Sequence, residues 1–115
     1  MTETLLRTEI VRDEQRFAAL SKEWDALAVR LETPLARHAW YMAALAALQQ
    51  HMFELSVVLI WNGELLVAAA PLMLDKMHLP TRLVPIDAFA GEPFRLLYRD
   101  TEALGALAKA CAGLK

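Results

Sequence analysis

The most continuous apolar stretch of the chain lies at residues 55–72, where LSVVLIW and LLVAAAPL flank a turn segment that begins with Asn62-Gly63. Asn-Gly favours a two-residue type I′ turn, because both central residues of that turn need a positive φ. The pattern therefore predicts a β-hairpin with strands over 55–61 and 64–70. Both strands are apolar on both faces, which indicates inner strands covered on two sides.

Before the hairpin the apolar residues change to helical spacing. A short strand is predicted over 5–12, and Asp13 follows it as a suitable helix N-cap. The sequence then predicts one helix that ends at Thr33-Pro34, because one apolar stripe recurs at spacings of three and four: Phe17, Leu20, Trp24, Leu27 and Leu31.

A second helix is predicted over 37–50. Its start is poorly capped, since Arg37-His38 stand where a Ser or Asp is expected. Its apolar face consists of Trp40, Tyr41, Ala44, Leu45 and Leu48.

After the hairpin the pattern is less regular. Pro71 lacks a backbone N–H, so it is expected to end or bulge the second strand. The residues that follow predict a turn at 80–81, a strand over 82–86, a loop over 87–93 and a short strand over 95–98.

The chain closes with a predicted helix that Asp100 or Thr101 caps. Its apolar stripe is Leu104, Leu107, Cys111 and Leu114. The predicted order is β-α-α-β-β-β-(β)-α, an α/β (α+β) fold in which helices pack on a mixed, mostly antiparallel sheet.

Composition supports one globular domain. The 115 residues are 57% hydrophobic and 23% charged, and the formal net charge is −2, with scattered basic residues. This balance disfavours nucleic-acid binding. The single cysteine excludes an internal disulfide and favours a reducing compartment, the cytoplasm. The N-terminus mixes charges into its apolar positions, unlike a secretory signal, and the run 39–48 is half a bilayer span, so no membrane insertion is expected.

Motifs that carry chemistry are lacking. The sequence has no GxSxG, HExxH or CxxC, and its four glycines stand too far apart to form a phosphate-cradling loop. We therefore predict no catalytic, cofactor-binding or metal-binding residue in this chain, and the pattern defines no substrate-binding residue.

Several residues are nevertheless of types that could form a site. His38, His51 and His78 lack metal-ligand spacing and are expected at the surface or at helix ends. Cys111, Trp24 and Trp40 lie on apolar stripes and are expected to pack in the core, although Trp40 could instead line a cleft. Asp87 and Glu92 form either an acid–base pair or, more simply, part of a solvated loop.

The order of these elements resembles the N-terminal part of CelD/BcsL-type acetyltransferases, a FemAB-like branch of the GNAT superfamily. The resemblance covers nearly the whole chain. Its pieces are Phe17…Leu20…Glu23-Trp24…Leu27, Thr33-Pro34, Ala39-Trp40, LSVVLIW, Asn62-Gly63-Glu64, LLVAAAPLML, the Arg82-Leu83 strand, the acidic loop with Gly91 and the Leu-Ala-rich last helix. Arg37-His38 departs from the family, which tends to show Ser-Pro there.

The resemblance implies that residues 1–115 are one GNAT-like N-terminal domain, truncated from a longer protein with two halves. The parent would transfer an acyl group from acetyl-CoA or another acyl-CoA to a polysaccharide (cellulose) precursor or similar acceptor. The donor site would lie outside this chain, which alone would be inactive. Its role would be acceptor binding or structural support, with the C-terminal catalytic half as partner.

A different function class remains open. A stand-alone, non-enzymatic module could bind a protein partner through an exposed sheet edge or the Ala-rich helix. A homodimer also remains open. A small hydrolase is disfavoured, because no nucleophile–base arrangement is visible.

Overall fold

The computed structural model describes residues 6–31, 37–47, 53–76, 82–86 and 96–113. Over these residues the chain forms an α+β fold with two sheets, and each strand pairing described is antiparallel. Sheet A contains, in spatial order, β1 (Leu6–Val11), β3 (Val57–Asn62), β4 (Leu65–Ala70) and β7 (Leu97–Tyr98). Sheet B contains β2 (Phe53–Leu55), β5 (Leu72–Asp75) and β6 (Arg82–Pro85).

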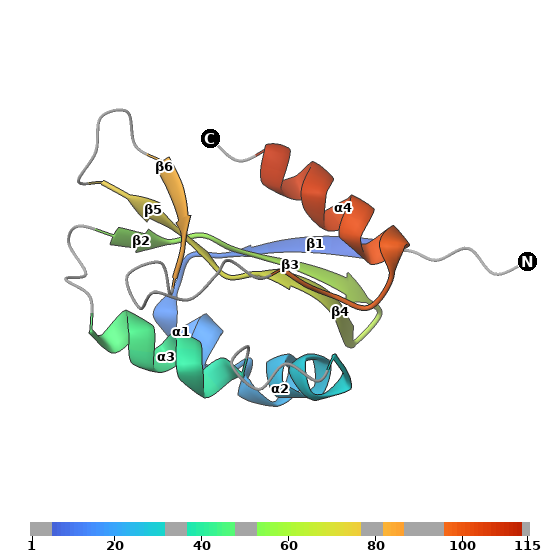
Figure 1. Ribbon diagram of the computed structural model, residues 1–115, viewed down its shortest axis with the longest axis horizontal. Coiled ribbons are helices and arrows are strands. Elements are labelled where there is room, and N and C mark those ends of the chain that lie inside the picture. The colour runs from blue at the N-terminus through green and yellow to red at the C-terminus, as the bar shows by residue number, and fades with distance from the viewer. Residues whose placement is uncertain (1–5, 32–36, 48–52, 77–81, 87–95, 114–115) are drawn as a thin grey trace, which may run out of the picture.

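Helices cover both faces of sheet A (Figure 1). One face carries α1 (Glu14–Ala18), α2 (Ser21–Arg30) and α3 (His38–Ala46), and the other carries α4 (Thr101–Ala112). Successive side chains of β3 alternate between the two cores, with Val57, Leu59 and Trp61 on the α1–α3 side and Val58 and Ile60 on the α4 side. The prediction of inner strands covered on two sides is confirmed.

The hairpin turn lies one residue later than predicted. Asn62 pairs with Leu65, so the connection consists of Gly63 and Glu64. Gly63 has φ 62°, the left-handed conformation that a primed two-residue hairpin turn needs at its first central position. Asn62 belongs to β3, so the predicted Asn62-Gly63 centre is wrong.

The central hairpin continues from one sheet into the other. It leaves sheet A at Ser56 on one strand and at Pro71 on the other. There Ser56 donates its N–H to the Leu72 carbonyl at 3.0 Å, and the Pro71 carbonyl accepts from Ile86 N–H at 2.8 Å. Pro71 ends β4 as predicted, whereas the sequence pattern did not predict β2 and β5 as separate strands.

The predicted long helix is two helices. A tight turn at residues 19–20 separates α1 from α2, with Leu20 N–H donating to the Phe17 carbonyl at 3.1 Å. The same carbonyl lies 2.6 Å from Nε2 of His38, which belongs to α3. In a continuous helix the Phe17 carbonyl would accept the N–H four residues later. Here it accepts from Leu20 N–H and lies against His38 instead.

The helix starts agree with the predictions. The Asp13 carboxylate accepts from Gln15 N–H at 3.1 Å, and the Asp100 carboxylate accepts from Ala103 N–H at 2.9 Å. Strands β1, β6 and β7 form within the predicted ranges, and the buried residues of α4 are Ala103 and Leu107. The predicted turn at 80–81, the loop at 87–93, Leu48 and Leu114 lie outside the described residues.

Helix α3 receives its cap from another helix. Its N-cap residue, Arg37, makes no side-chain cap, as the sequence predicted. The Asp25 carboxylate of α2 accepts from His38 N–H at 2.8 Å and pairs with the Arg37 guanidinium at 3.0 Å. One carboxylate therefore caps α3 and ties it to α2.

Replacing Asp25 tests this cap. Asp25→Ala is expected to lower the free energy of unfolding by about 1–2 kcal/mol, because a helix cap and an ion pair are lost together. Asp25→Asn keeps an oxygen for His38 N–H and is expected to lose less. Urea denaturation measures both, and equal losses would contradict a cap at this position.

Candidate functional site

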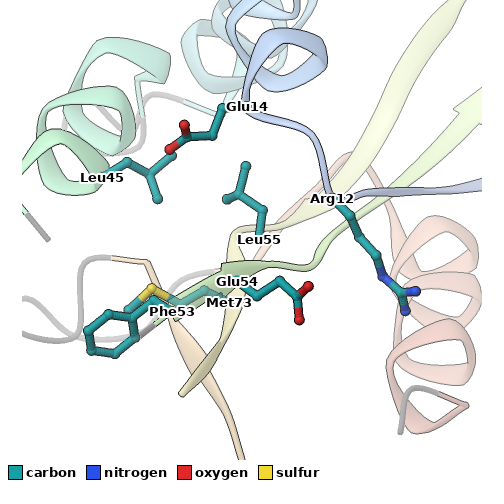
Figure 2. Close-up of a pocket in the computed structure, with 7 residues that line it drawn as sticks. All are labelled: Arg12, Glu14, Leu45, Phe53, Glu54, Leu55 and Met73. Atoms are coloured by element: carbon teal, nitrogen blue, oxygen red, sulfur yellow. The ribbon is translucent and has the colours of Figure 1, made fainter. Parts of the chain in front are cut away.

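A pocket of about 190 Å³ opens on sheet B, beside α1 and α3 (Figure 2). Strand β2 supplies all three of its residues to the lining, and β5 and α3 supply one each. The remaining two are Arg12, which follows β1, and Glu14, the first residue of α1. The lining residues are Arg12, Glu14, Leu45, Phe53, Glu54, Leu55 and Met73.

The lining is amphipathic. Leu45, Leu55 and Met73 are buried and form an apolar floor, whereas Arg12, Glu14 and Glu54 are exposed at the rim. Glu54 also pairs with Lys76 at 3.5 Å across an exposed surface. A site of this size and character fits one small apolar group flanked by polar atoms, and it is smaller than the roughly 300 Å³ at which drug-sized ligand pockets begin.

The sequence did not predict this pocket. The charged cluster that begins with Arg12 marks the end of the first predicted strand, but no sequence pattern links it to residues 53–55 or to Met73. That link depends on β2 and β5, which are short and continue the longer strands past Ser56 and Pro71.

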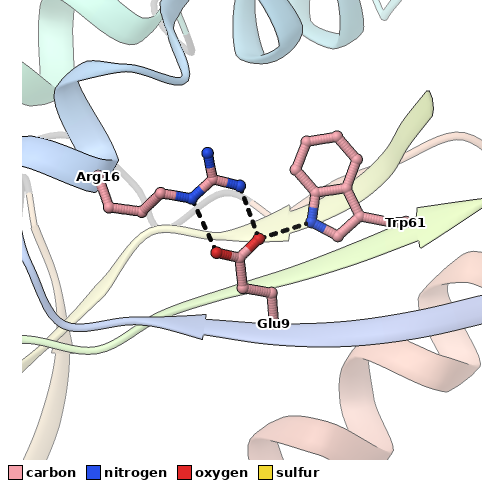
Figure 3. A network of polar contacts seen from close by, with 3 residues as sticks. All are labelled: Glu9, Arg16 and Trp61. Atoms are coloured by element: carbon pink, nitrogen blue, oxygen red, sulfur yellow. Dashed lines mark hydrogen bonds and ion pairs between the residues drawn. The ribbon is translucent and has the colours of Figure 1, made fainter. Parts of the chain in front are cut away.

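A polar network lies on the α1–α3 side of sheet A (Figure 3). The Arg16 guanidinium donates two hydrogen bonds to the Glu9 carboxylate, at 2.8 and 2.9 Å, and the Trp61 indole N–H donates a third at 3.0 Å. The Arg7 guanidinium lies over the Trp61 ring, 5.5 Å from its centroid. The network ties α1 to the two strands at this edge of the sheet.

This network shifts the acidity of its members. The hydrogen bond from Arg16 lowers the pKa of Glu9, burial opposes it, and the Trp61 bond lowers it further. The bond to Glu9 likewise raises the pKa of Arg16. Glu23 adds negative charge near Arg16, and its Oε2 is buried with no hydrogen-bond partner among the described residues.

His38 is not at the surface. It stands at the first residue of α3, as a helix-end position, but it is 4% exposed. Its ring packs 4.8 Å from Phe17 and 6.3 Å from Trp24, measured between ring centroids. The helix-end alternative of the prediction therefore holds for His38, whereas its burial against the aromatic core was not predicted. His51 and His78 lie outside the described residues.

The other candidates take structural places. Trp24 is buried, and Trp40 is half-buried against the same core rather than among the pocket residues. Cys111 is half-buried against the α4 core, and burial raises the pKa of its thiol, which disfavours the reactive thiolate. Asp87 and Glu92 lie outside the described residues.

The protein's own carboxylates occupy the N-termini of α1, α3 and α4. They belong to Asp13, Asp25 and Asp100, and each accepts a backbone N–H of the first turn. The hydrogen bond from Ala103 N–H lowers the pKa of Asp100. Burial acts to raise the pKa of Asp25, but the hydrogen bonds from Arg37 and His38 outweigh burial, so this pKa is lowered as well. Ionised carboxylates at these positions oppose the binding of a second anion.

Metal clusters and membrane-spanning helices are lacking in the part of the chain that the structure describes. Among those residues, no group of three or more His, Cys, Asp or Glu side chains is arranged to hold a metal ion. None of the helices within the described ranges has the length and apolar character to cross a membrane.

Comparison with known proteins adds no relative. No protein-family profile matches the chain, and no curated protein or solved structure shows significant similarity to it.

The Glu9 network predicts a pH-dependent contribution to stability. The lowered pKa of Glu9 means that the folded state favours its ionised form. The contribution of Glu9 to stability is therefore present above the ordinary pKa of 4.5 and is lost as the pH falls through the folded pKa. Glu9→Gln is expected to lower the free energy of unfolding by about 1 kcal/mol at neutral pH, with the gap to wild type closing below about pH 4.

Urea denaturation followed by tryptophan fluorescence at several pH values measures this gap. Glu64→Gln, in the exposed turn after β3, is the control and is expected to change stability by less than about 0.5 kcal/mol. A gap for Glu9→Gln that is the same at every pH would contradict the assigned network.

Proposed function

We propose that this chain is the N-terminal, acceptor-side domain of a GNAT-superfamily acyltransferase resembling those of polysaccharide (cellulose) biosynthesis. The observation that carries the proposal is the order of elements around sheet A. A first strand, helices, an antiparallel hairpin and a last helix follow one another along the chain, and the proposal rests on this order.

The occupied helix ends support a donor site outside this chain. An acyl-CoA donor carries phosphates, which proteins commonly hold at a helix N-terminus. Here Asp13, Asp25 and Asp100 each accept one backbone N–H at the start of α1, α3 and α4, respectively, and place negative charge there. We therefore assign the acyl-CoA to the C-terminal catalytic half of the parent protein.

The pocket on sheet B supports an acceptor-side role. Its exposed carboxylates and Arg12 offer hydrogen bonds to hydroxyl groups, and its floor offers apolar contact. Its small volume suits one ring or substituent of a larger acceptor rather than a whole coenzyme.

A second candidate function has its own observation. Strand β1 forms one edge of sheet A, with no strand on its outer side among the described residues. An open edge of this length suits a non-enzymatic module that binds a partner by strand addition.

Calorimetric titration with acetyl-CoA tests the placement of the donor site. The 115-residue chain is expected to give no saturable binding heat, because no described helix N-terminus of α1, α3 or α4 is open to an anion. Saturable binding of acetyl-CoA to this chain would contradict the proposal.

NMR titration with cellotetraose tests the acceptor-side role. Amide shifts are expected at residues 53–55 and at Met73, and Glu54→Ala is expected to weaken them. Glu64→Ala is the matched control, because it removes an exposed carboxylate away from the pocket. No shifts, or shifts that Glu54→Ala leaves unchanged, would contradict acceptor binding at this pocket.

A further inference from the structure

The hydrogen bonds of the central hairpin determine which groups of β1 face outward. Backbone N–H and C=O groups of successive strand residues point to alternate sides. Ser56 N–H bonds toward β5, so Val57, Leu59 and Trp61 point toward β1. The bond from Arg99 N–H to the Val67 carbonyl shows that Val67 points its carbonyl toward β7, which agrees with this alternation.

The outward groups of β1 therefore belong to alternate residues. Val11, Glu9 and Arg7 lie opposite Val57, Leu59 and Trp61 and share hydrogen bonds with β3. Leu6, Thr8 and Ile10 point their backbone groups away from the sheet, with no partner among the described residues. The Ile10 side chain is 41% exposed beside them.

We propose that β1 pairs antiparallel with β1 of a second copy of this chain, in a register centred on Thr8. In this register Thr8 faces Thr8 of the second copy, Arg7 faces Glu9, and Leu6 faces Ile10. The outward backbone groups of Leu6, Thr8 and Ile10 then bond across the two-fold axis. The two four-stranded sheets become one continuous sheet of eight strands, four from each copy.

Charge selects this register. Centring the pairing one residue earlier places Arg7 opposite Arg7, and one residue later places Glu9 opposite Glu9. Like charges directly opposite each other destabilise a strand pair, whereas opposite charges stabilise it. Only the Thr8 centre among these three gives two Arg–Glu pairs.

Glu9 can accept the additional partner. Its carboxylate offers about four acceptor positions. Arg16 and the Trp61 indole occupy three of them with the hydrogen bonds described above. Arg7 and Glu9 share the same face of β1, and in the proposed register they are non-hydrogen-bonded pairs, which bring opposing side chains closest.

The other face of the pair is apolar. Leu6, Thr8 and Ile10 lie on the α4 side of sheet A, where Leu6 already packs against the α4 core. A two-fold axis perpendicular to the sheet keeps both α4 helices on this face. Pairing therefore covers Ile10 with Leu6 of the second copy, and it stacks threonine on threonine at the axis, a favourable cross-strand pair.

This inference rests on the second candidate function, binding through a sheet edge, and not on the acyltransferase proposal. Sedimentation equilibrium is expected to show a reversible dimer of the 12.9 kDa chain. Arg7→Glu places a second carboxylate opposite Glu9 of the other copy and is expected to weaken dimerisation at least about tenfold. Lys22→Glu, on the exposed side of α2, changes the net charge equally and is expected to leave dimerisation unchanged.

Cysteine cross-linking tests the register. In a Cys111→Ser background, Thr8→Cys is expected to form an intermolecular disulfide with oxidised glutathione, because directly opposite residues lie about 5.5 Å apart. Arg7→Cys is the matched control. Two cysteines at position 7 are offset by two residues along the strands, about 8 Å apart, and are expected to cross-link poorly.

Amide exchange separates the possible failures. In the proposed dimer, Thr8 and Ile10 amides are protected, and the protection falls on dilution. A monomer at all concentrations, equal effects of Arg7→Glu and Lys22→Glu, or cross-linking at position 7 rather than 8 would overturn the inference. If the chain is a monomer and its β1 amides exchange rapidly, the dimer fails but the edge is open, and binding of another partner at this edge stands. If these amides are protected in a monomer, the dimer and the sheet-edge binding function both fail.

Discussion

The phase of hydrogen bonding in the central hairpin is the constraint on which the rest of the structure depends. A register shift between Ile60 and Trp61 interrupts the pairing of β3 with β4. Once Ser56 N–H bonds to Leu72, the alternation of backbone groups still assigns each residue of β3 to a side. It places β1 against β3, places β7 against β4, and carries both strands past Ser56 and Pro71 into sheet B. The pocket lies on this second sheet, because β2 and β5 supply four of its seven lining residues.

Carboxylates organise the polar contacts around this hairpin. Asp25 caps α3 and holds it on α2, which buries His38 against Phe17 and Trp24. Glu9 ties α1 to β1 and β3 through Arg16 and Trp61. Acidic side chains also lie at the N-termini of α1, α3 and α4, where their negative charge opposes the binding of a second anion.

Local patterns predicted the central hairpin and the helix starts, but not the division of the first helix or the separate strands β2 and β5. The apolar runs around Gly63 and the helix caps at Asp13 and Asp100 depend on nearby residues, and the structure has them. At the break between α1 and α2 the Phe17 carbonyl accepts from Leu20 N–H and contacts His38, which is distant in sequence and therefore invisible to a local pattern. The pocket was missed for the same reason, since β2 and β5 are short and gain their place by pairing with each other.

Through-hydrogen-bond scalar couplings measure the central constraint most directly. In a chain labelled with ¹⁵N and ¹³C, a long-range HNCO spectrum is expected to join Ser56 N to the Leu72 carbonyl carbon and Ile86 N to that of Pro71. A coupling from Leu55 N to the Met73 carbonyl would mean the opposite phase. That result would turn the outward groups of β1 inward and contradict the account of the sheets, the pocket and the edge.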